Sequence, residues 1–200
     1  MFKERLLAEF KIKAQEVGFD DFAVTDLNDF EFHTKKMQDF INNNYHGEMD
    51  WLKEKIDIRK DPKNIWKEAK SAIILGMNYG PEKNPIRELK EKKKAYISIY
   101  SRRKDYHKVI KSKLKLLAKF IQEKSDAQVK VFVDTAPIME KPLAQAAGIG
   151  WSGKHTNIVS KKFGSWLFLG VILTNIVVKK KKQKKIFCGT CEKCKDACPT

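Results

Sequence analysis

Apolar residues recur at helical spacing, every three or four positions, in four segments of the chain. This spacing predicts amphipathic helices over residues 2–17, 29–43, 105–124 and 137–148. Gly18 follows the first segment, where a helix C-terminus commonly sits. Pro137 leads the last segment, which suits the first turn of a helix.

Strand-like runs lie between these helices. Short apolar stretches predict strands over residues 22–24, 72–77, 96–100, 129–133, 157–159 and 166–178. The run 72–77 is continuously apolar, as expected of a strand covered on both faces. Residues 81–94 are polar and are expected to form a mobile excursion from the core. Because strands alternate with helices, the predicted fold class is α/β, with helices layered on a sheet.

The length allows one main domain and a small appendage. With 200 residues, 42% of them hydrophobic, the chain can bury one substantial core. We expect an α/β domain over residues 1–178 and a short second part over residues 179–200. The lysine-rich run at residues 179–185 separates the two. Its composition is typical of a linker, and also of a basic arm that faces phosphates.

The start of the chain shows no export pattern. No long apolar region with a small-residue cleavage site follows Met1. No stretch approaches the ~18 uninterrupted apolar residues of a membrane span. The sequence therefore predicts a cytoplasmic protein without a membrane partner.

The formal net charge is +16. Basic side chains on one face bind nucleic acids because they release counterions from phosphates. Among the 41 basic residues the only arginines are Arg5, Arg59, Arg87, Arg102 and Arg103. A lysine-rich composition that serves solubility therefore explains the charge equally well. The charge agrees with a polyanionic partner without selecting one.

All four cysteines lie near the C-terminal end, as Cys188, Cys191, Cys194 and Cys198. Their spacing, C-x2-C-x2-C-x3-C followed by proline, is the ferredoxin-type run that holds four-iron four-sulfur clusters. A disulfide framework would spread its cysteines through a small secreted fold. Structural zinc is the alternative, but zinc ribbons normally place two C-x2-C pairs far apart. The spacing favours iron–sulfur clusters.

In two-cluster proteins the fourth cysteine of this run serves the other cluster. Cys188, Cys191 and Cys194 would then lack a fourth ligand, and Cys198 would begin a second cluster. We therefore expect the chain to be part of a longer protein. If it ends at Thr200, neither cluster should be complete.

Asp134 follows the strand predicted at residues 129–133. Ligands often bind at strand ends in α/β folds, so Asp134 is a candidate general acid at the lip of a pocket. Alternatively it caps the next helix, because aspartate is a favoured N-cap residue. The glycine-rich segment 148–156 suits close approach to phosphates or to a large flat ligand, but it matches neither common phosphate motif. An ordinary loop is the alternative there.

Several strings together resemble the epoxyqueuosine reductase family. In chain order they are HGEMDWL at 46–52, RKDP at 59–62, KDYHKV at 104–109, VDTAP at 133–137, AGIGWSGK at 147–154, FGSW at 163–166 and the cysteine run ending in ACPT at 197–200. The resemblance covers nearly the whole chain. It implies a reductive-dehalogenase-like core that binds cobalamin, followed by the start of a ferredoxin-like module that delivers electrons to cobalt.

The same resemblance implies an oxidoreductase activity, the reduction of epoxyqueuosine to queuosine in tRNA, which is the last step of queuosine biosynthesis. The implied cofactors are cobalamin and, in the full-length protein, two four-iron four-sulfur clusters. The implied partners are tRNA and an external electron donor, and the expected state is a monomer.

The resemblance also implies residue roles. Asp134 matches the family's proton donor, and burial would hold its carboxyl neutral near pH 7. Arg59, Asp134, His155, Ile158 and Leu169 match positions around the corrinoid, where apolar walls with a few polar groups are expected. Plain core packing is the alternative for Ile158 and Leu169.

Other functional classes compete with this one. A ferredoxin-like electron carrier would explain the cysteines but leave the α/β core without a task. A corrinoid reductase of a small molecule would share that core, although the charge and the quoted strings favour tRNA. A nucleic-acid-binding module with a structural cluster would bind tRNA with a steep salt dependence and would not bind cobalamin.

Overall fold

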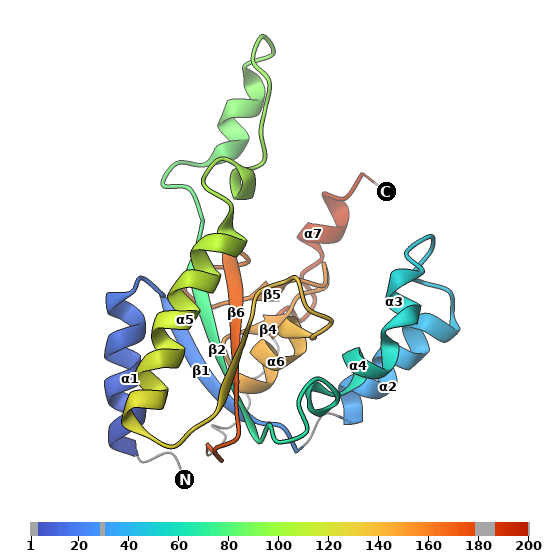
Figure 1. Cartoon of the computed structure of the whole chain (residues 1–200). Helices are drawn as coiled ribbons and strands as arrows, with labels where there is room; N and C mark the ends of the chain where they lie inside the picture. The colour runs from blue at the N-terminus through green and yellow to red at the C-terminus, as the bar shows by residue number, and fades with distance from the viewer. Residues whose placement is uncertain (1–3, 29–30, 179–186, 200) are drawn as a thin grey trace.

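The computed structural model describes residues 4–28, 31–178 and 187–199. Its centre is a four-stranded sheet in the order β1-β2-β6-β3. The strands are β1 (Asp21–Asp26), β2 (Ser71–Asn78), β3 (Val129–Phe132) and β6 (Leu167–Thr174). All neighbouring strands run antiparallel. Helices cover both faces of this sheet, which confirms the predicted layered α/β class (Figure 1).

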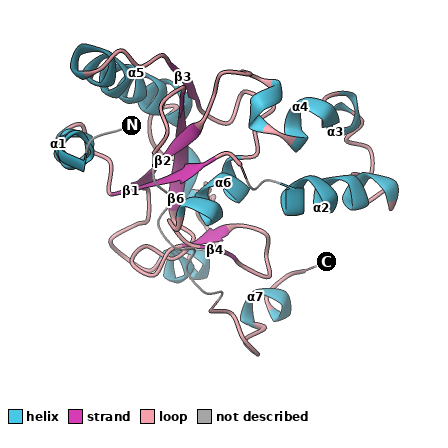
Figure 2. Cartoon of the chain, turned by 90° about the horizontal axis from the view of Figure 1, so that it is seen from below, coloured by secondary structure: helices cyan, strands magenta, loops and turns pink. Residues whose placement is uncertain are grey.

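Two long helices lie on one face of the sheet and one shorter helix lies on the other (Figure 2). The first face carries α1 (Glu4–Glu16) and α5 (Tyr106–Lys124). The second face carries α6 (Glu140–Ala147). Beside α6 stand α2 (Glu31–Asn42), α3 (Trp51–Glu54) and α4 (Ile56–Lys60) (Figures 1 and 2). The chain therefore folds into three layers with a lateral group of helices.

The alternation of side chains along β2 explains why its sequence is continuously apolar. Ile73 and Leu75 lie in the core under α1 and α5. Ala72 and Ile74 lie in the core under α6. Because successive residues of a strand point to opposite faces, both sets must be apolar in a strand covered on both sides. The prediction for this run is confirmed.

The helix ends follow simple local rules. Gly18 ends α1 and Gly148 ends α6, both in the left-handed region with φ of +91° and +88°. Glycine takes this conformation without the steric cost that a Cβ atom brings. Asp105 caps α5, because its side chain accepts a hydrogen bond from the backbone N–H of His107. This cap positions the first turn of α5.

Several predicted elements differ from the structure, and the strand predicted over residues 166–178 already ends at Thr174. The strand predicted at residues 96–100 is wrong. This segment is irregular and leads into a short 3-10 helix, Ile99–Ser101. The helix predicted from Pro137 starts later, at Glu140, because residues 134–137 form bends and residues 138–139 are irregular. The strand near residue 158 exists as β5 (Ile158–Val159), but it pairs with β4 (Trp151–Ser152) in a separate small sheet.

The wrong strand prediction at residues 96–100 has a clear physical reason. Residues 81–104, which we call the arm, stand out from the body of the molecule (Figure 1). The arm contains a 3-10 helix, Pro85–Lys90, and the aromatic ring of Tyr96 lies under the guanidinium of Arg102 at 4.8 Å. A strand needs a partner strand for its backbone groups. Residues 96–100 have none among the described residues, so their apolar pattern does not produce a strand.

The remaining elements are a 3-10 helix, Pro62–Asn64, and α7 (Lys193–Asp196) within the cysteines. The lysine-rich run at residues 179–185 lies outside the described residues, as do the first residues of the helices predicted from residues 2 and 29. Among the helices of the described ranges, none is long and apolar enough to cross a membrane.

Candidate active site

Asp134 lies in the loop that joins β3 to α6. It follows the buried Val133, and its φ of +45° falls in the left-handed region that non-glycine residues rarely adopt. Its side chain is 60% exposed, so the expected burial of this carboxyl is wrong for the structure. It does not cap α6 either, because the N-cap position belongs to Met139. The capping alternative is therefore excluded.

Two residues in the first turn of α5 bind the carboxylate of Asp134. The hydroxyl of Tyr106 donates a hydrogen bond to Asp134 Oδ2 at 2.5 Å. His107 Nε2 lies 3.6 Å from the same oxygen. Burial, and then the bond to Asp134, raise the pKa of the Tyr106 phenol well above its ordinary value. Tyr106 therefore stays a hydrogen-bond donor throughout the physiological pH range.

His107 is itself oriented by the helix cap. Its Nδ1 atom lies 2.8 Å from Asp105 Oδ1. That hydrogen bond holds the pKa of the Asp105 carboxyl below its ordinary value. Asp105, His107 and Asp134 form a row in which the imidazole bridges two carboxylates.

Glu140, the first residue of α6, binds the backbone of Asp134. Its Oε1 atom accepts a hydrogen bond from the N–H of Asp134 at 2.8 Å. Burial raises the pKa of the Glu140 carboxyl to about 7; the bond from Asp134 N–H opposes this shift and the negative charge of Asp134 adds to it. We call Tyr106, His107, Asp134 and Glu140 the acid site.

A column of stacked rings fixes Tyr106 in place. Its ring stacks on His107 at 4.0 Å and on Phe168 of β6 at 4.1 Å. Phe168 stacks in turn on Tyr79 at 4.1 Å, and the edge of Trp166 meets Tyr79 at 5.5 Å. The column runs from the acid site across the ends of β6 and β2. Rings held on both faces leave Tyr106 little rotational freedom, so its hydroxyl is preorganised toward Asp134.

The glycine-rich segment 148–156 forms the β4–β5 hairpin. A Cβ atom on Gly150 would lie 2.2 Å from the backbone oxygen of Val159, closer than any real contact. A Cβ atom on Gly153 would lie 2.8 Å from the ring of His155. The contact with backbone requires a glycine at position 150, whereas a side chain at position 153 would displace the ring of His155.

The residues predicted around the corrinoid lie in different surroundings. Ile158 is 5% exposed in the core under α6, and Leu169 of β6 packs against that core. His155 Nδ1 accepts a hydrogen bond from the backbone N–H of Asn157 at 3.1 Å. Arg59 lies on α4, with its guanidinium 4.9 Å from the ring centre of Trp51. The structure thus joins Ile158 and Leu169 in one core and leaves Asp134 with its α5 and α6 partners.

Arg59 carries a buried donor without a partner. Its Nε atom is buried and has no hydrogen-bond partner within the described residues. Burial lowers the pKa of its guanidinium. Since buried donors are normally satisfied, an unpaired one indicates a missing ligand or water.

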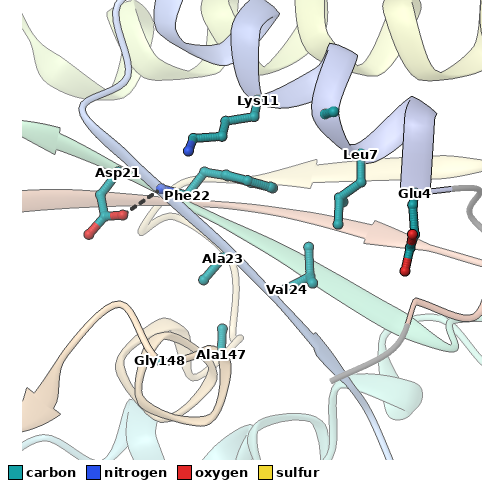
Figure 3. Close-up of a pocket in the computed structure, with 10 residues that line it drawn as sticks. Glu4, Leu7, Lys11, Asp21, Phe22, Ala23, Val24, Ala147 and Gly148 are labelled. Atoms are coloured by element: carbon teal, nitrogen blue, oxygen red, sulfur yellow. Dashed lines mark hydrogen bonds between the residues drawn. The ribbon is translucent and has the colours of Figure 1, made fainter. Parts of the chain in front are cut away.

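A cavity of about 420 Å³ lies between α2 and α6 and extends to the β4–β5 hairpin. Its walls combine apolar and basic groups, among them Met37, Phe40, Met139 and Lys141, and it ends at Thr156, next to His155. A second cavity of about 420 Å³ lies between α1, the open edge of β1 and the end of α6 (Figure 3). That one contains none of the predicted site residues.

The cysteines lie in residues 187–199, which we call the cysteine segment. No disulfide joins them, and Cys191 and Cys198 are exposed. Within the described residues, no three histidine, cysteine or acidic side chains are grouped as a metal site requires. Cluster binding by these cysteines therefore stays a prediction based on their spacing.

The cysteine segment touches the β4–β5 hairpin through a few contacts. The indole N–H of Trp151 lies 3.1 Å from Cys188 Sγ, and the ring of Trp151 meets Phe187 edge-on at 5.1 Å. Lys154 Nζ lies 3.3 Å from Glu192 Oε1. These contacts place the cysteines beside the glycine-rich loop.

Sequence analysis predicted no role for Tyr106, His107 or Glu140. The first two stand in the KDYHKV string that contributed to the resemblance, and this string is the signal that could have identified them. Glu140 stood inside a predicted helix, where an acidic residue is unremarkable. Because α6 starts at Glu140 and not at Pro137, the carboxyl of Glu140 can accept a hydrogen bond from the backbone N–H of Asp134.

Comparison with known proteins finds matches to the epoxyqueuosine reductase family. A family model described as epoxyqueuosine reductase QueG, DUF1730, matches residues 59–135. The epoxyqueuosine reductase of Leadbetterella byssophila is 38% identical over 193 residues, which cover 96% of this chain and 62% of that protein. The Escherichia coli epoxyqueuosine reductase is 36% identical over 198 residues, 98% of this chain and 52% of that protein. The chain thus spans about half to three fifths of the length of these relatives.

Solved structures agree. An epoxyqueuosine reductase in complex with an epoxyqueuosine-modified tRNA-Tyr stem loop has a TM-score of 0.80 at 30% identity, covering 98% of this chain and 52% of that chain. The Bacillus subtilis enzyme, solved with its Asp134 catalytic loop swung out of the active site, has a TM-score of 0.78 at 28% identity, with the same coverage.

A B12-dependent reductive dehalogenase has a more distant likeness. Its TM-score is 0.56 at 11% identity, covering 89% of this chain and 20% of that chain. At this identity the match shows the fold alone. It confirms the predicted reductive-dehalogenase-like architecture.

Proposed function

Since the chain belongs to the epoxyqueuosine reductase family in sequence and in fold, we propose that it supplies the acid-bearing and cobalamin-binding part of an enzyme that reduces epoxyqueuosine to queuosine in tRNA. In that reaction one oxygen leaves as water and an alkene forms, which consumes two electrons and two protons. The observation that carries the proposal is the acid site, where Asp134 is exposed and held by residues of α5 and α6.

Asp134 would donate a proton to the departing oxygen. An unprotonated oxygen is a poor leaving group, so a positioned acid lowers the barrier. The exposed side chain of Asp134 is open to an approaching substrate. His107, held by Asp105 and 3.6 Å from Asp134 Oδ2, is placed to return a proton after each turnover.

The loop of residues 133–139 would take two positions. The Bacillus subtilis relative was solved with its Asp134 catalytic loop swung out of the active site. In this chain the loop is bonded to α5 through Tyr106 and to α6 through Glu140. We propose that the loop of this chain can also swing out, and that both bonds are broken in that state.

Cobalamin would supply a strongly reducing metal centre when bound. Its predicted surround fits in part: Arg59 has a buried, unpaired Nε donor, and Ile158 and Leu169 offer apolar walls. His155 would contribute an imidazole from the loop between β4 and β5, where its neighbour Thr156 lines the cavity between α2 and α6. Large ligands bind in sites of this mixed character, with few polar groups that fix orientation.

The cysteines would hold the iron–sulfur clusters together with ligands from the rest of a longer protein. In the described residues they are not gathered around one point. We propose that cluster binding itself orders the cysteine segment, as is common when metal ligands lie on a short segment. An external electron donor would reduce the clusters.

The domain boundary would follow from this division of tasks. Residues 1–178 would form the cobalamin-binding catalytic domain, and residues 179–200 a basic linker and the first part of the cluster module. We further propose that the protein acts in the cytoplasm as a monomer.

The arm supports tRNA as the partner. Five apolar side chains on it are at least 41% exposed, namely Ile86, Leu89, Tyr96, Ile97 and Tyr100. Lysines and arginines surround them, including the run Lys92, Lys93 and Lys94. Exposed aromatic rings among basic groups suit RNA, because bases stack on the rings while cations contact phosphates.

Salt dependence tests the role of the arm. Replacing Lys92, Lys93 and Lys94 with alanine in the complete protein should weaken tRNA binding. It should also reduce the slope of log affinity against log salt by about 0.7–0.9 for each lost phosphate contact. Replacing Lys111, Lys115 and Lys119 on the exposed face of α5 removes the same charge and should leave the slope unchanged. Equal effects of both triple variants would mean that general charge, and not the arm, binds tRNA.

A cobalamin titration tests the function itself. The complete protein and this chain are titrated anaerobically with cob(II)alamin and followed by optical and electron paramagnetic resonance spectra. Stoichiometric binding beside cluster signals is expected, and Arg59→Ala should weaken binding about tenfold or more, since it removes a charged donor. The exposed Arg5→Ala is the matched control. Clusters without cobalamin binding by the complete protein would favour an electron carrier, and cobalamin binding without tRNA affinity would favour a small-molecule reductase.

A further inference from the structure

A hydrogen bond from its main chain links the acid-bearing loop to α6. Glu140 Oε1 accepts the N–H of Asp134 across six residues of chain. Glu140 itself is anchored, because Leu143, Ala144 and Ala147 of the same helix are buried in the core under the sheet. The carboxylate therefore joins a loop to a fixed helix.

The loop needs such an attachment. Asp134 has a φ of +45°, which is costly for a residue with a side chain. The N–H of Thr135 turns back onto the carbonyl of Val133, and the N–H of Ile138 onto the carbonyl of Ala136 at 2.7 Å. Backbone conformations of this kind persist only where surrounding contacts determine them. For Asp134 these contacts are Tyr106 at the side chain and Glu140 at the main chain.

The two contacts act on different parts of Asp134. The bond from Tyr106 ends on the carboxylate, which must change partners when a proton is transferred. The bond to Glu140 ends on the backbone N–H and survives any change in the charge of the Asp134 side chain. Val133 and Ile138 also anchor the loop through their buried side chains, but of the two contacts made by Asp134 itself only the second is independent of the charge of its side chain.

We propose that Glu140 is the positioning residue that holds the loop of residues 133–139 in the position seen here, bonded to α5 and α6, and so sets where the carboxyl of Asp134 lies. The catalytic role of the Asp134 carboxyl rests on the proposed function, whereas the hydrogen bond between Glu140 and the loop does not. A carboxyl group suits the task because its oxygen accepts the N–H in either protonation state, and more strongly when it is ionised.

The charges around Glu140 are consistent with this role. Asp134 faces it from the loop, His107 and Tyr106 from α5, and Lys141 lies beside it on α6. His107 and Lys141 favour the ionised carboxylate and Asp134 opposes it. The attachment thus lies within the same electrostatic group as the proposed proton donor.

Two variants separate positioning from general stability. Glu140→Met keeps the length of the side chain but removes the acceptor. Glu140→Gln keeps an oxygen that can accept the Asp134 N–H. Glu123→Met, at the exposed end of α5, is the control for removal of a surface carboxylate. Amide hydrogen exchange of residues 132–139 is measured by mass spectrometry on the full chain, with β2 and α5 as internal references.

Glu140→Met should accelerate exchange of the loop about tenfold or more, since a hydrogen bond to a charged group is lost, while β2 and α5 stay protected. Glu140→Gln should restore most of the protection. In the complete enzyme, kcat should fall with Glu140→Met at nearly constant KM, and Glu140→Gln should recover it.

Unchanged loop exchange in Glu140→Met would overturn the proposal. Equal acceleration in the loop, β2 and α5 would do so as well, because Glu140 would then only stabilise the fold. If the loop alone accelerates but the parent enzyme shows no turnover of epoxyqueuosine, the attachment stands and the proposed function fails.

Discussion

The acid site and the cysteine segment differ in how clearly the sequence and the structure each show their function. The cysteines carry a specific sequence signal, yet within the described residues they are not gathered into a metal site. Asp134 carries almost no signal of its own, yet its carboxylate and backbone are both bonded to anchored helices. The stronger motif thus belongs to the less assembled region.

The difference follows from what each region must bind. A cluster brings its own geometry, so the chain needs only thiolates at suitable intervals and can be shaped by the metal. A proton donor brings none, so the fold must fix it with partners from several elements. These partners lie far apart in the sequence, from Tyr106 to Glu140, so they form no short sequence motif.

The largest effect is expected from glycines in the two regions. Gly150→Ala would place a Cβ atom 2.2 Å from the carbonyl of Val159 and should destabilise the protein by about 3 kcal/mol, as overpacking against backbone does. Gly189→Ala in the cysteine segment meets no atom within 4 Å. Its φ of +48° carries only a local cost, so the unfolding midpoint should hardly change.

Urea unfolding of both variants measures the contrast. Comparable losses of stability would mean that the cysteine segment contributes to the cooperative core as much as the hairpin does, and the difference between the regions would disappear.

A smaller effect is expected from pH. Burial raises the pKa of Glu140 to about 7, above the ordinary 4.5, so between pH 5 and 7 the folded protein keeps a proton that the unfolded chain has lost. Stability should therefore fall as pH rises through this window, by on the order of 2 kcal/mol in total. Glu140→Gln should remove this pH dependence of the unfolding free energy. Compared with the parent protein, the variant should therefore be relatively more stable at pH 8 than at pH 5.

Glu192 provides the comparison in the cysteine segment. Hydrogen bonds from Lys195 and Lys154 lower the pKa of this exposed carboxyl, so its effect has the opposite sign and is screened by solvent. Thermal unfolding from pH 5 to pH 8 should show a changed slope for Glu140→Gln and none for Glu192→Gln. A changed slope in both would show that the regions are electrostatically alike.

The smallest effect is expected at the contact between the regions. Trp151→Phe keeps the ring but removes the N–H that lies 3.1 Å from Cys188 Sγ. At alkaline pH, where the thiol is ionised with or without this bond, its loss should free the sulfur and raise the reactivity of Cys188 toward a thiol reagent about two- to fivefold in the cluster-free chain. Trp166→Phe, whose ring packs on Tyr79, is the matched control. Mass spectrometry of each labelled cysteine distinguishes Cys188 from the others; no change there would remove Trp151 as the tether.

The fold was predictable where packing is simple. The continuous apolar run of β2 and the amphipathic helix over residues 105–124 follow from periodicity and are confirmed, with Leu114 and Leu117 of α5 fully buried. Residues 96–100 failed because periodicity does not reveal whether a partner strand exists. The start of α6 failed because a proline marks a permitted helix start and does not require one there.

The site was predictable only in outline. Asp134 was identified by its place after a strand and by resemblance, but its exposure and its left-handed backbone were not. Both depend on Tyr106, from another element, and on Glu140, brought close by the bends before α6. Such contacts across elements are tertiary and leave no local pattern in the sequence.

The most direct test of the central claim is single-turnover reduction of epoxyqueuosine in tRNA by the complete enzyme carrying Asp134→Asn. Asparagine keeps the size of the side chain but has no carboxyl proton to donate, so the rate should fall about 10²–10⁴-fold with cobalamin and tRNA binding unchanged. Asp126→Asn, on the exposed connection between α5 and β3, should react like the parent enzyme. A rate for Asp134→Asn equal to that of the parent would remove Asp134 from the reaction and contradict the assignment of the acid site.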